Sequence, residues 1–369
     1  MYKPMQILQL NMQKRREVQH SVMNDPSLKE YTALAISEPH VFEMHGKVST
    51  SPMGHQSWTA ILPSQRHDGR WAVRSMLWVR KDIECEQVRV PSADLTVALL
   101  RLPDRAVLLA SVYVEGANAA ALSKTLMLLD TAIRTAQGRS GPRLDVVVAG
   151  DFNRHDQLWG GDGVLPTRQG EADPIIDFMN KWGLESLLPR GTKTWQNASR
   201  ATTIDLMLAS QELGASVLKC KIHDTEHGSD HRAIETSFDV AVPDHAIQPR
   251  LLFKNAPWKA IRERIARALQ DRPAFGDVQR QADRLMQIVL DAVSTLTPKA
   301  KPSPYEKRWW TKDLTKLRRV YTYWRNRARA QRRGGDALPQ LEQQARAAAK
   351  EYHDAIRKQQ RLHWDEFLA

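Results

Sequence analysis

Short apolar runs dominate the first 240 residues, and turn-forming residues bound each run. Runs of this length and composition predict β-strands. Nine of them occur: MQILQL, TALAIS, SWTAILP, AVRSMLWV, LTVALLRL, VLLASVYV, LDVVVAG, TIDLMLA and HRAIETSFDV. Helical periodicity occurs at 15–24, 119–137 and 173–183, and Asp173-Pro174 gives the last helix a capping residue and a proline suited to its first turn. We therefore expect an α/β or α+β sandwich whose sheet faces are covered by helices.

The pattern changes at 240–253, VAVPDHAIQPRLLF, where two prolines and several polar residues interrupt it. The periodicity beyond this point is helical, at 257–271, 276–296, 311–333 and 336–368. PKAKPSP (298–304) reads as a stiff linker between the two helix pairs, and Gly334-Gly335 breaks the last helical stretch. We expect three parts: a domain at 1–242, a linker at 243–256 and a helical extension at 257–369.

Charge separates the two ends of the chain. Residues 250–369 hold 27 Lys and Arg against 13 Asp and Glu, a net charge of +14, whereas residues 1–249 have a net charge of −2. A basic segment suggests a polyanionic partner, most plausibly nucleic acid. A solvated, charged helix face explains the charge alone equally well.

The two cysteines, Cys85 and Cys220, lie far apart and lack the spacing of a metal site. This pattern argues against a disulfide framework and favours a reducing, intracellular setting. The N-terminus has no apolar core followed by a cleavage site, and no apolar stretch approaches 18 residues. We therefore expect neither a secretory signal nor a membrane span.

Polar residues occur at or just after the ends of the expected strands, where α/β folds usually place functional groups. Each has an ordinary explanation when taken alone: Asn11 as a turn former, Glu38 as a solvated acid, and Asp151 as a turn cap. Asp205 differs because it interrupts an apolar strand, so its carboxylate must be paired or functional. The joint pattern is harder to dismiss; the full set is Asn11, Glu38, Tyr113, Asp151, Asn153, Asp205 and Asp230-His231.

Three ordered motifs, AGDFN, TIDLML and GSDH, resemble the signature of the endonuclease/exonuclease/phosphatase superfamily. LQLNMQ, ISEPH and SVY resemble its remaining motifs, so the resemblance spans residues 5–240. It implies an α/β fold built as a two-sheet sandwich, followed in this chain by a basic α-helical extension. It also implies a metal-dependent phosphodiesterase.

The resemblance implies that Glu38 is the principal ligand of Mg²⁺, with Asn11 and Asp230 close to the ion. Carboxylate oxygens and retained waters suit this hard cation, and Mn²⁺ is the alternative. One position departs from DNA-repair endonucleases of the superfamily, which often carry an acid where this chain has Gln13. This difference weakens a second metal site and the interpretation as a repair enzyme.

The remaining roles implied by the resemblance concern water and the scissile phosphate. Asp151 would orient and deprotonate the attacking water, and Asn153 would hold that water or a phosphate oxygen. His231 would contact the phosphate, with Asp205 fixing its ring and favouring the imidazolium. Tyr113 would donate to a phosphate oxygen. The ion and the imidazolium would together offset the charge that develops in the transition state.

The C-terminal third resembles the linker between endonuclease and reverse transcriptase in non-LTR retrotransposons. The resemblance rests on Trp309-Trp310, a basic helix at 312–333, and His363-Trp364 followed by Phe367-Leu368. We expect the tryptophan pair to pack between helices rather than to stack on bases. The arginine density at 318–333 favours a nucleic-acid contact, made largely to phosphate, over a solvated face.

Three residues are expected to bind phosphate or DNA: Arg318, Arg319 and Thr194, which lies in GTKTW and matches a phosphate-contacting Thr of relatives. The basic helices are also a candidate surface for RNA or for a reverse transcriptase module. No polymerase signature occurs, so we interpret the chain as the front part of a retroelement reading frame. It would nick DNA in the nucleus and leave a 3′-hydroxyl.

Two other functions remain open from the sequence. One is an inactive remnant retained as a nucleic-acid-binding module, although all the implied catalytic residues are present. The other is a small-molecule or lipid phosphodiesterase, which leaves the basic extension without a task. Neither the target site nor the role of Trp195 follows from the sequence.

Overall fold

The computed structural model describes residues 3–69, 72–140, 144–168, 170–197, 200–243, 251–270, 277–299, 309–333 and 338–368. The chain forms two compact units, Met1–His245 with Tyr305–Ala369, and Ala246–Pro304. Half of the expected linker (244–250), the end of the proline-rich segment (300–304) and Gly334-Gly335 lie outside the described residues.

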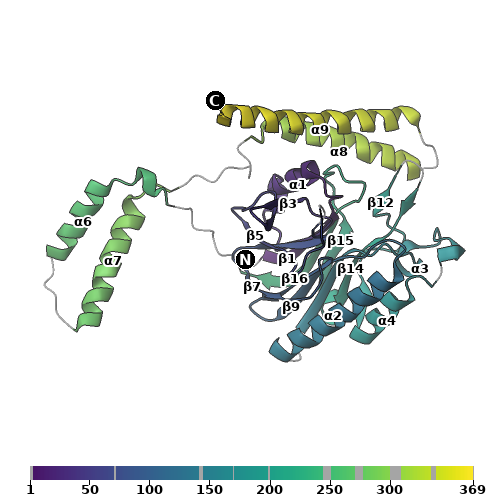
Figure 1. Ribbon diagram of the computed structural model, residues 1–369, viewed down its shortest axis with the longest axis horizontal. Helices are drawn as coiled ribbons and strands as arrows, with labels where there is room; N and C mark the ends of the chain where they lie inside the picture. Colours follow the sequence, from purple (N-terminus) through teal and green to yellow (C-terminus); the bar gives the residue numbers. More distant parts are fainter. Residues whose placement is uncertain are drawn as a thin grey trace. The chain divides into compact units, whose positions relative to one another are not determined.

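Two six-stranded sheets form the core of the first unit (Figure 1). The first sheet has the order β15-β16-β1-β2-β6-β5, and the second has the order β11-β14-β10-β9-β8-β7. The strands of the first are β1 (Lys3–Asn11), β2 (Ala33–Ser37), β5 (Trp58–Ile61), β6 (Ser75–Arg80), β15 (Val217–Ile222) and β16 (Ile234–Val242). Those of the second are β7 (Glu84–Val88), β8 (Leu95–Arg101), β9 (Ala106–Tyr113), β10 (Leu144–Asp151), β11 (Leu184–Ser186) and β14 (Asp205–Ser210).

The two sheets pack face to face because their central strands carry apolar side chains on both faces. Ile7, Leu77, Leu109 and Val147, from four different strands, belong to one buried cluster between the sheets. All nine strands expected from the sequence are present, and the expected α/β sandwich is confirmed.

Helices cover the outer faces of both sheets. α1 (Arg16–Met23) packs on the first sheet through Val18 and Val22. α2 (Ala119–Ser140) and α4 (Asp173–Trp182) pack on the second. Two short helices, α3 (Gln157–Gly160) and α5 (Gln211–Gly214), and three 3₁₀ turns, Pro26–Leu28, Pro166–Arg168 and Phe253–Asn255, complete the helical elements outside α6–α9.

Several short strands have no clear apolar pattern and were not expected, and their positions explain why. β7 and β15 lie at sheet edges, where one face is open to solvent and charged residues alternate with apolar ones. The other missed strands are β11 at an edge and two small hairpins, β3 (Val41–Met44) with β4 (Lys47–Thr50) and β12 (Trp195–Gln196) with β13 (Ala201–Thr202).

The C-terminal region is helical, as expected. α6 (Trp258–Gln270) and α7 (Val278–Leu296) form a helix pair in the second unit. α8 (Lys312–Arg333) and α9 (Pro339–Leu368) form a second pair that belongs to the first unit. No helix among the described residues is long and apolar enough to cross a membrane.

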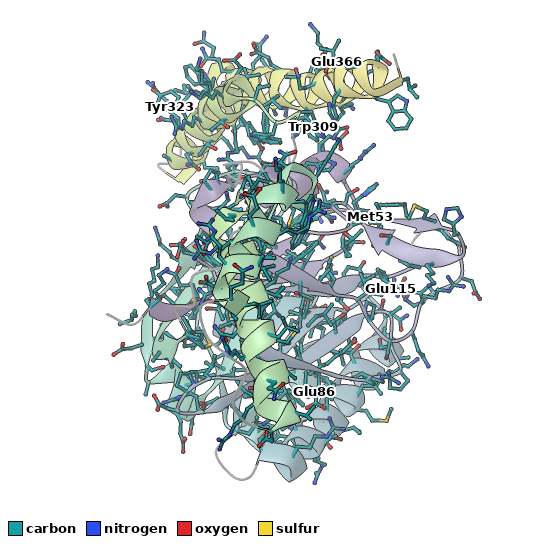
Figure 2. All side chains as sticks on the ribbon, turned by 90° about the vertical axis from the view of Figure 1, so that its left-hand side faces the viewer. Met53, Glu86, Glu115, Trp309, Tyr323 and Glu366 are labelled. Atoms are coloured by element: carbon teal, nitrogen blue, oxygen red, sulfur yellow. The ribbon has the colours of Figure 1, made fainter. Side chains whose placement is uncertain are left out.

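The tryptophan pair packs between helices, as the sequence analysis favoured. Trp309 and Trp310 are buried with Tyr321 and Tyr352 in a cluster between α8 and α9. The rings of His20 in α1 and Trp309 also meet in a T-shaped contact, with ring centroids 5.1 Å apart. Figure 2 shows Trp309 beneath the two helices, whereas Tyr323 of α8 is exposed.

Candidate active site

Strand ends meet at one edge of the sandwich and bring the expected polar residues together. β1 and β2 are parallel, so Asn11 and Ser37 are register partners at their ends. β9 and β10 are also parallel, and they end together at Tyr113 and Asp151. β14 runs antiparallel to β10 and begins at Asp205, the register partner of Asp151.

Asp151 is buried and is held from both sides. Asn11 Nδ2 donates to Asp151 Oδ2 at 2.9 Å, and the backbone N–H of Asn153 donates to Oδ1 at 3.0 Å. The side chain of Asn153 donates in turn to the carbonyl of Val114, and its φ of 50° places it in the left-handed region. Asparagine tolerates this conformation better than most residues, which suits the tight turn after β10.

His231 and Asp205 form a buried pair beside Asp151. His231 Nδ1 lies 2.8 Å from Asp205 Oδ2, and Gln9 Nε2 donates to Asp205 Oδ1 at 2.9 Å. The other ring nitrogen, Nε2, lies 3.9 Å from Asp151 Oδ2 and 3.8 Å from Asp230 Oδ1. Asp205 therefore fixes the orientation of the ring, and Nε2 faces the acids at the edge of the sandwich.

Burial and charge shift the proton affinity of this group. Burial, followed by the negative charge of Asp205, raises the pKa of Asp151 to about 7, although His231 opposes the shift. Burial opposes the charged form of His231, but the carboxylates of Asp205, Asp151 and Asp230 outweigh it and raise its pKa to about 10. The ring is therefore protonated at neutral pH, where Asp151 is close to its own titration.

Glu38 and Tyr113 lie on the β2 and β9 side of the same edge. Glu38 follows β2 with a φ of 46°, and its Oε1 lies 2.5 Å from Lys14 Nζ. Burial and then the charges of Glu38 and Asp151 raise the pKa of the Tyr113 hydroxyl. Tyr113 therefore remains a neutral donor, and the guanidinium of Arg74 lies 5.0 Å from the centre of its ring.

Asp230 has one oxygen held and one oxygen without a hydrogen bond. Trp195 Nε1 donates to Asp230 Oδ2 at 2.9 Å, which gives Trp195 a positioning role in this site. Oδ1 is buried with no hydrogen-bond partner among the described residues. Gln13, which stands where repair enzymes often carry an acid, accepts from the backbone N–H of Asp230 at 3.3 Å.

The site offers oxygen ligands for a hard cation. Asp230 has an oxygen without a hydrogen-bond partner among the described residues, and Glu38 has a carboxylate that forms an ion pair with Lys14. Carboxylate oxygens of this kind are suited to Mg²⁺. Ligand atoms of Asp151, Asp205 and His231 also lie within 4.8 Å of one another. Those atoms are engaged mainly with their neighbours, so Asp230 Oδ1 is the better candidate, and Glu38 is the ligand that the resemblance implies.

Two expected phosphate-binding residues are placed differently from the expectation. Thr194 is fully buried, and its Oγ1 accepts from the backbone N–H groups of Ile204 and Asp205, so it orders the start of β14. Arg318 is buried beside Asp25, with Nη2 3.3 Å from Oδ1, and neither position suits a contact with DNA. Arg319 is exposed on α8.

Three supporting residues escaped the sequence analysis: Gln9, Lys14 and Arg74. Gln9 alternates with apolar residues inside β1, where a buried amide is expected to have a specific partner. That signal was available in the sequence, but its partner, Asp205, lies 196 residues away. The roles of Lys14 and Arg74 depend on loop geometry that no local pattern reveals.

The two six-stranded sheets and the helices that cover them form a fold that is known from solved endonuclease structures. The endonuclease domain of TRAS1, a telomere-specific non-LTR retrotransposon, has this fold and matches with a TM-score of 0.52 at 16% identity. The match covers 64% of this chain and 99% of that one. The AP endonuclease LMAP from Leishmania major matches with a TM-score of 0.49 at 13% identity, over 65% of this chain and 89% of that one.

A family model matches part of the sequence of this domain. Residues 107–235, which hold the AGDFN, TIDLML and GSDH motifs, match the family model described as endonuclease-reverse transcriptase. The resemblance expected from the motifs is therefore confirmed. No curated protein matches the chain.

Proposed function

We propose that the first 242 residues hydrolyse DNA phosphodiesters in a Mg²⁺-dependent reaction, as a retrotransposon-type endonuclease. The observation that carries the proposal is the buried His231–Asp205 pair facing Asp151 at the shared edge of the two sheets. The family match over residues 107–235 and the retrotransposon endonuclease fold support the same assignment. The expected product is a nick with a 3′-hydroxyl.

Asp151 is the general base in this proposal. It accepts two hydrogen bonds that fix its orientation, and burial raises its pKa toward neutrality. A base with a pKa near the working pH is most effective at removing a proton from water. Asn153, held at the turn after β10, is placed to orient that water or a phosphate oxygen.

His231 and Tyr113 stabilise the phosphate. The protonated ring of His231 presents Nε2–H to a non-bridging or leaving oxygen, because Asp205 holds Nδ1 on the opposite side. Tyr113 keeps its hydroxyl proton and donates a hydrogen bond to a phosphate oxygen. Donors fixed before the reaction stabilise developing charge without a cost of reorganisation.

Glu38 and Asp230 would hold the magnesium ion, with Asn11 close by. A bound Mg²⁺ supplies positive charge that polarises the phosphate and stabilises the leaving oxygen. Asn11 also links this part of the site to the base through its bond to Asp151. Lys14, which forms an ion pair with Glu38, is positioned to orient that carboxylate.

Arg319 is proposed as a contact to the DNA backbone outside the catalytic edge. It is exposed on α8, and so is Arg327, whose guanidinium lies over the rings of Tyr323 and Trp324. Arginines on one helix can position a duplex through its phosphates without reading its sequence. This contact would be strongly dependent on salt concentration.

Nicking of supercoiled plasmid by the full chain, with Mg²⁺ and with a chelator, tests the proposed function. We expect Mg²⁺-dependent nicking, its loss in Glu38→Ala, and retention in Glu212→Ala, a control at an exposed acid on α5. Extension of the nick by a DNA polymerase checks the 3′-hydroxyl. Absence of nicking by the wild type, or full activity in Glu38→Ala, would overturn the proposal.

A further inference from the structure

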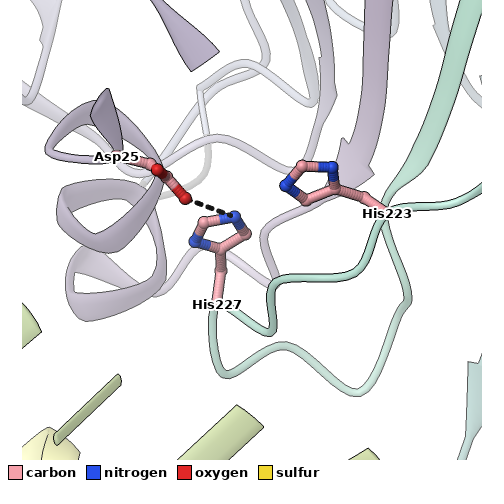
Figure 3. A group of neighbouring side chains, drawn as sticks. All are labelled: Asp25, His223 and His227. Carbon is pink, nitrogen blue, oxygen red and sulfur yellow. Dashed lines mark ion pairs between the residues drawn. The ribbon is translucent and has the colours of Figure 1, made fainter. Parts of the chain in front are cut away.

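A second buried cluster of acid and imidazole groups lies away from the candidate active site. It consists of Asp25, which follows α1, His223, which follows β15, and His227, in the loop between β15 and β16 (Figure 3). The exposed fractions of the three residues are 3%, 9% and 3%. None of the three belongs to a motif that the superfamily resemblance used.

One atom of each side chain faces the other two and has no hydrogen-bond partner among the described residues. These atoms are Asp25 Oδ2, His223 Nε2 and His227 Nε2, and the ligand atoms of the three residues lie within 4.8 Å of one another. Asp25 Oδ2 and His227 Nε2 are 3.8 Å apart, which is too far for a hydrogen bond. Leaving three buried polar atoms unpaired is costly, so their convergence calls for a common partner.

The opposite atom of each side chain is firmly held. His223 Nδ1 lies 2.7 Å from Glu235 Oε2, and His227 Nδ1 lies 3.0 Å from Ser21 Oγ. Asp25 Oδ1 accepts from the backbone N–H of Ser27 at 3.0 Å. Residues that bind metals are commonly oriented in this way, with a carboxylate or hydroxyl behind the ligating histidine.

We propose that Asp25, His223 and His227 bind a zinc ion. Two imidazole nitrogens and one carboxylate oxygen are a donor set that zinc accepts readily, whereas Mg²⁺ prefers oxygen ligands alone. Water or another donor completes the four ligands that zinc usually takes. The carboxylate of Asp25, with that of Glu235 behind His223, balances the ion, while Arg318 contacts the other oxygen of Asp25.

The zinc ion would be structural. It joins the segment after α1, which holds Asp25, to the loop that leaves β15 and continues to Asp230 and His231, so two segments far apart in sequence become fixed to one another. His227 lies four residues before His231, and Ser229 Oγ between them donates to the carbonyl of Asn11 at 2.7 Å. The proposed site is therefore separate from the Mg²⁺ site and stabilises the loop that completes it.

Zinc content of the full chain tests this site directly. The protein is stripped with a chelator, incubated with zinc sulfate, freed of excess metal and measured by mass spectrometry. We expect one zinc per chain in the wild type and in His231→Ala, and none in His227→Ala. Glu235→Gln, which removes the carboxylate behind His223, should weaken zinc binding by about 10- to 100-fold.

X-ray absorption at the zinc edge of the wild type supplies a measurement that needs no variant. Two imidazoles and no sulfur among the ligands are expected, whereas an ion bound by Asp151, Asp205 and His231 would show one imidazole. Saturating zinc should also raise the Tm of the wild type by about 5 °C or more. A wild type that stays free of zinc, a single imidazole, or full zinc content in a folded His227→Ala would overturn the proposal.

Discussion

Two buried clusters of aspartate and histidine draw on the same loop, yet they use their polar atoms differently. At the catalytic edge, His231 Nδ1 is paired with Asp205, whose second oxygen accepts from Gln9. In the other cluster, one atom each of Asp25, His223 and His227 points inward without a hydrogen-bond partner among the described residues. Residue types alone therefore do not distinguish the two, because both offer carboxylates and imidazoles.

The distribution of hydrogen bonds separates their chemistry. His231 is paired with one acid and faces a second acid on its other side. Both carboxylates favour the protonated ring, and the pKa of His231 is raised to about 10. A histidine whose fixed nitrogen points away from the cluster can offer the lone pair of its other nitrogen to a metal ion. The first arrangement suits the stabilisation of an anionic phosphate, and the second suits the binding of a metal ion.

Replacing Asp205 should have the largest effect on catalysis. In Asp205→Asn the ring of His231 loses the charge that favours its imidazolium, and we expect nicking to fall by about 10²- to 10⁴-fold. The rate of plasmid nicking under saturating Mg²⁺ measures the change. Asp177→Asn, at an exposed position on α4, is the matched control and should nick at the wild-type rate.

Full activity in Asp205→Asn would show that the His–Asp pair does not support catalysis. An unfolded variant would be recognised by circular dichroism. In that case His231→Gln is tested in place of Asp205→Asn, because glutamine keeps a neutral donor at position 231 while removing the imidazolium. Its activity should also fall by about 10²-fold or more.

Arg318 and Arg319 make the same kind of comparison within one helix. Arg318 is buried against Asp25 and the carbonyl of Ser21, so Arg318→Ala leaves a buried acid without its cation. We expect the free energy of unfolding to fall by about 3 kcal/mol. Arg319→Ala, at the exposed neighbouring position, should change it by less than about 0.5 kcal/mol.

Chemical denaturation of both variants, with a chelator in all samples so that no zinc accompanies Asp25, measures these differences. DNA affinity across a salt series should show the reverse order, with the larger change in Arg319→Ala. Arg319→Ala should reduce the salt dependence by about one phosphate contact, whereas folded Arg318→Ala should retain it. Equal losses of stability in the two variants would contradict the burial argument.

The grouping of the candidate site residues could be predicted because parallel strands end at a common edge and the motifs mark those ends. Asn11, Tyr113 and Asp151 each terminate a strand that the apolar pattern already revealed. Thr194 shows where this reasoning fails, since its motif match says nothing about whether the hydroxyl faces solvent or the backbone of β14. Burial depends on the β12–β13 hairpin, which was too short to recognise.

The docking of α8 and α9 was also beyond prediction from the sequence. Their arginines read as a uniform basic surface, yet Arg318 and Arg329 form ion pairs with Asp25 and Glu226, which are distant in sequence. Periodicity gives the faces of a helix but not the acids that meet them. The zinc cluster is hidden for the same reason, because Asp25 and His223 are brought together only by the fold.

The pH dependence of nicking should show the smallest effect, and it tests the coupling within the catalytic cluster. Nicking requires Asp151 without its proton and His231 with its proton. Activity should therefore rise as pH increases through about 7 and fall as pH approaches about 10. Below the pKa of Asp151, each further decrease of one pH unit should reduce the rate by about 10-fold.

The acid limb should also respond to the magnesium concentration. A divalent cation near Asp151 favours its charged form, so saturating Mg²⁺ should move this limb to lower pH than limiting Mg²⁺ does. The alkaline limb should move down in Asp205→Asn, because the ring of His231 then loses the first of the charges that raise its pKa. An alkaline limb unchanged by Asp205→Asn would mean that a group other than His231 carries the essential proton, and the distinction between the two clusters would then rest on zinc binding alone.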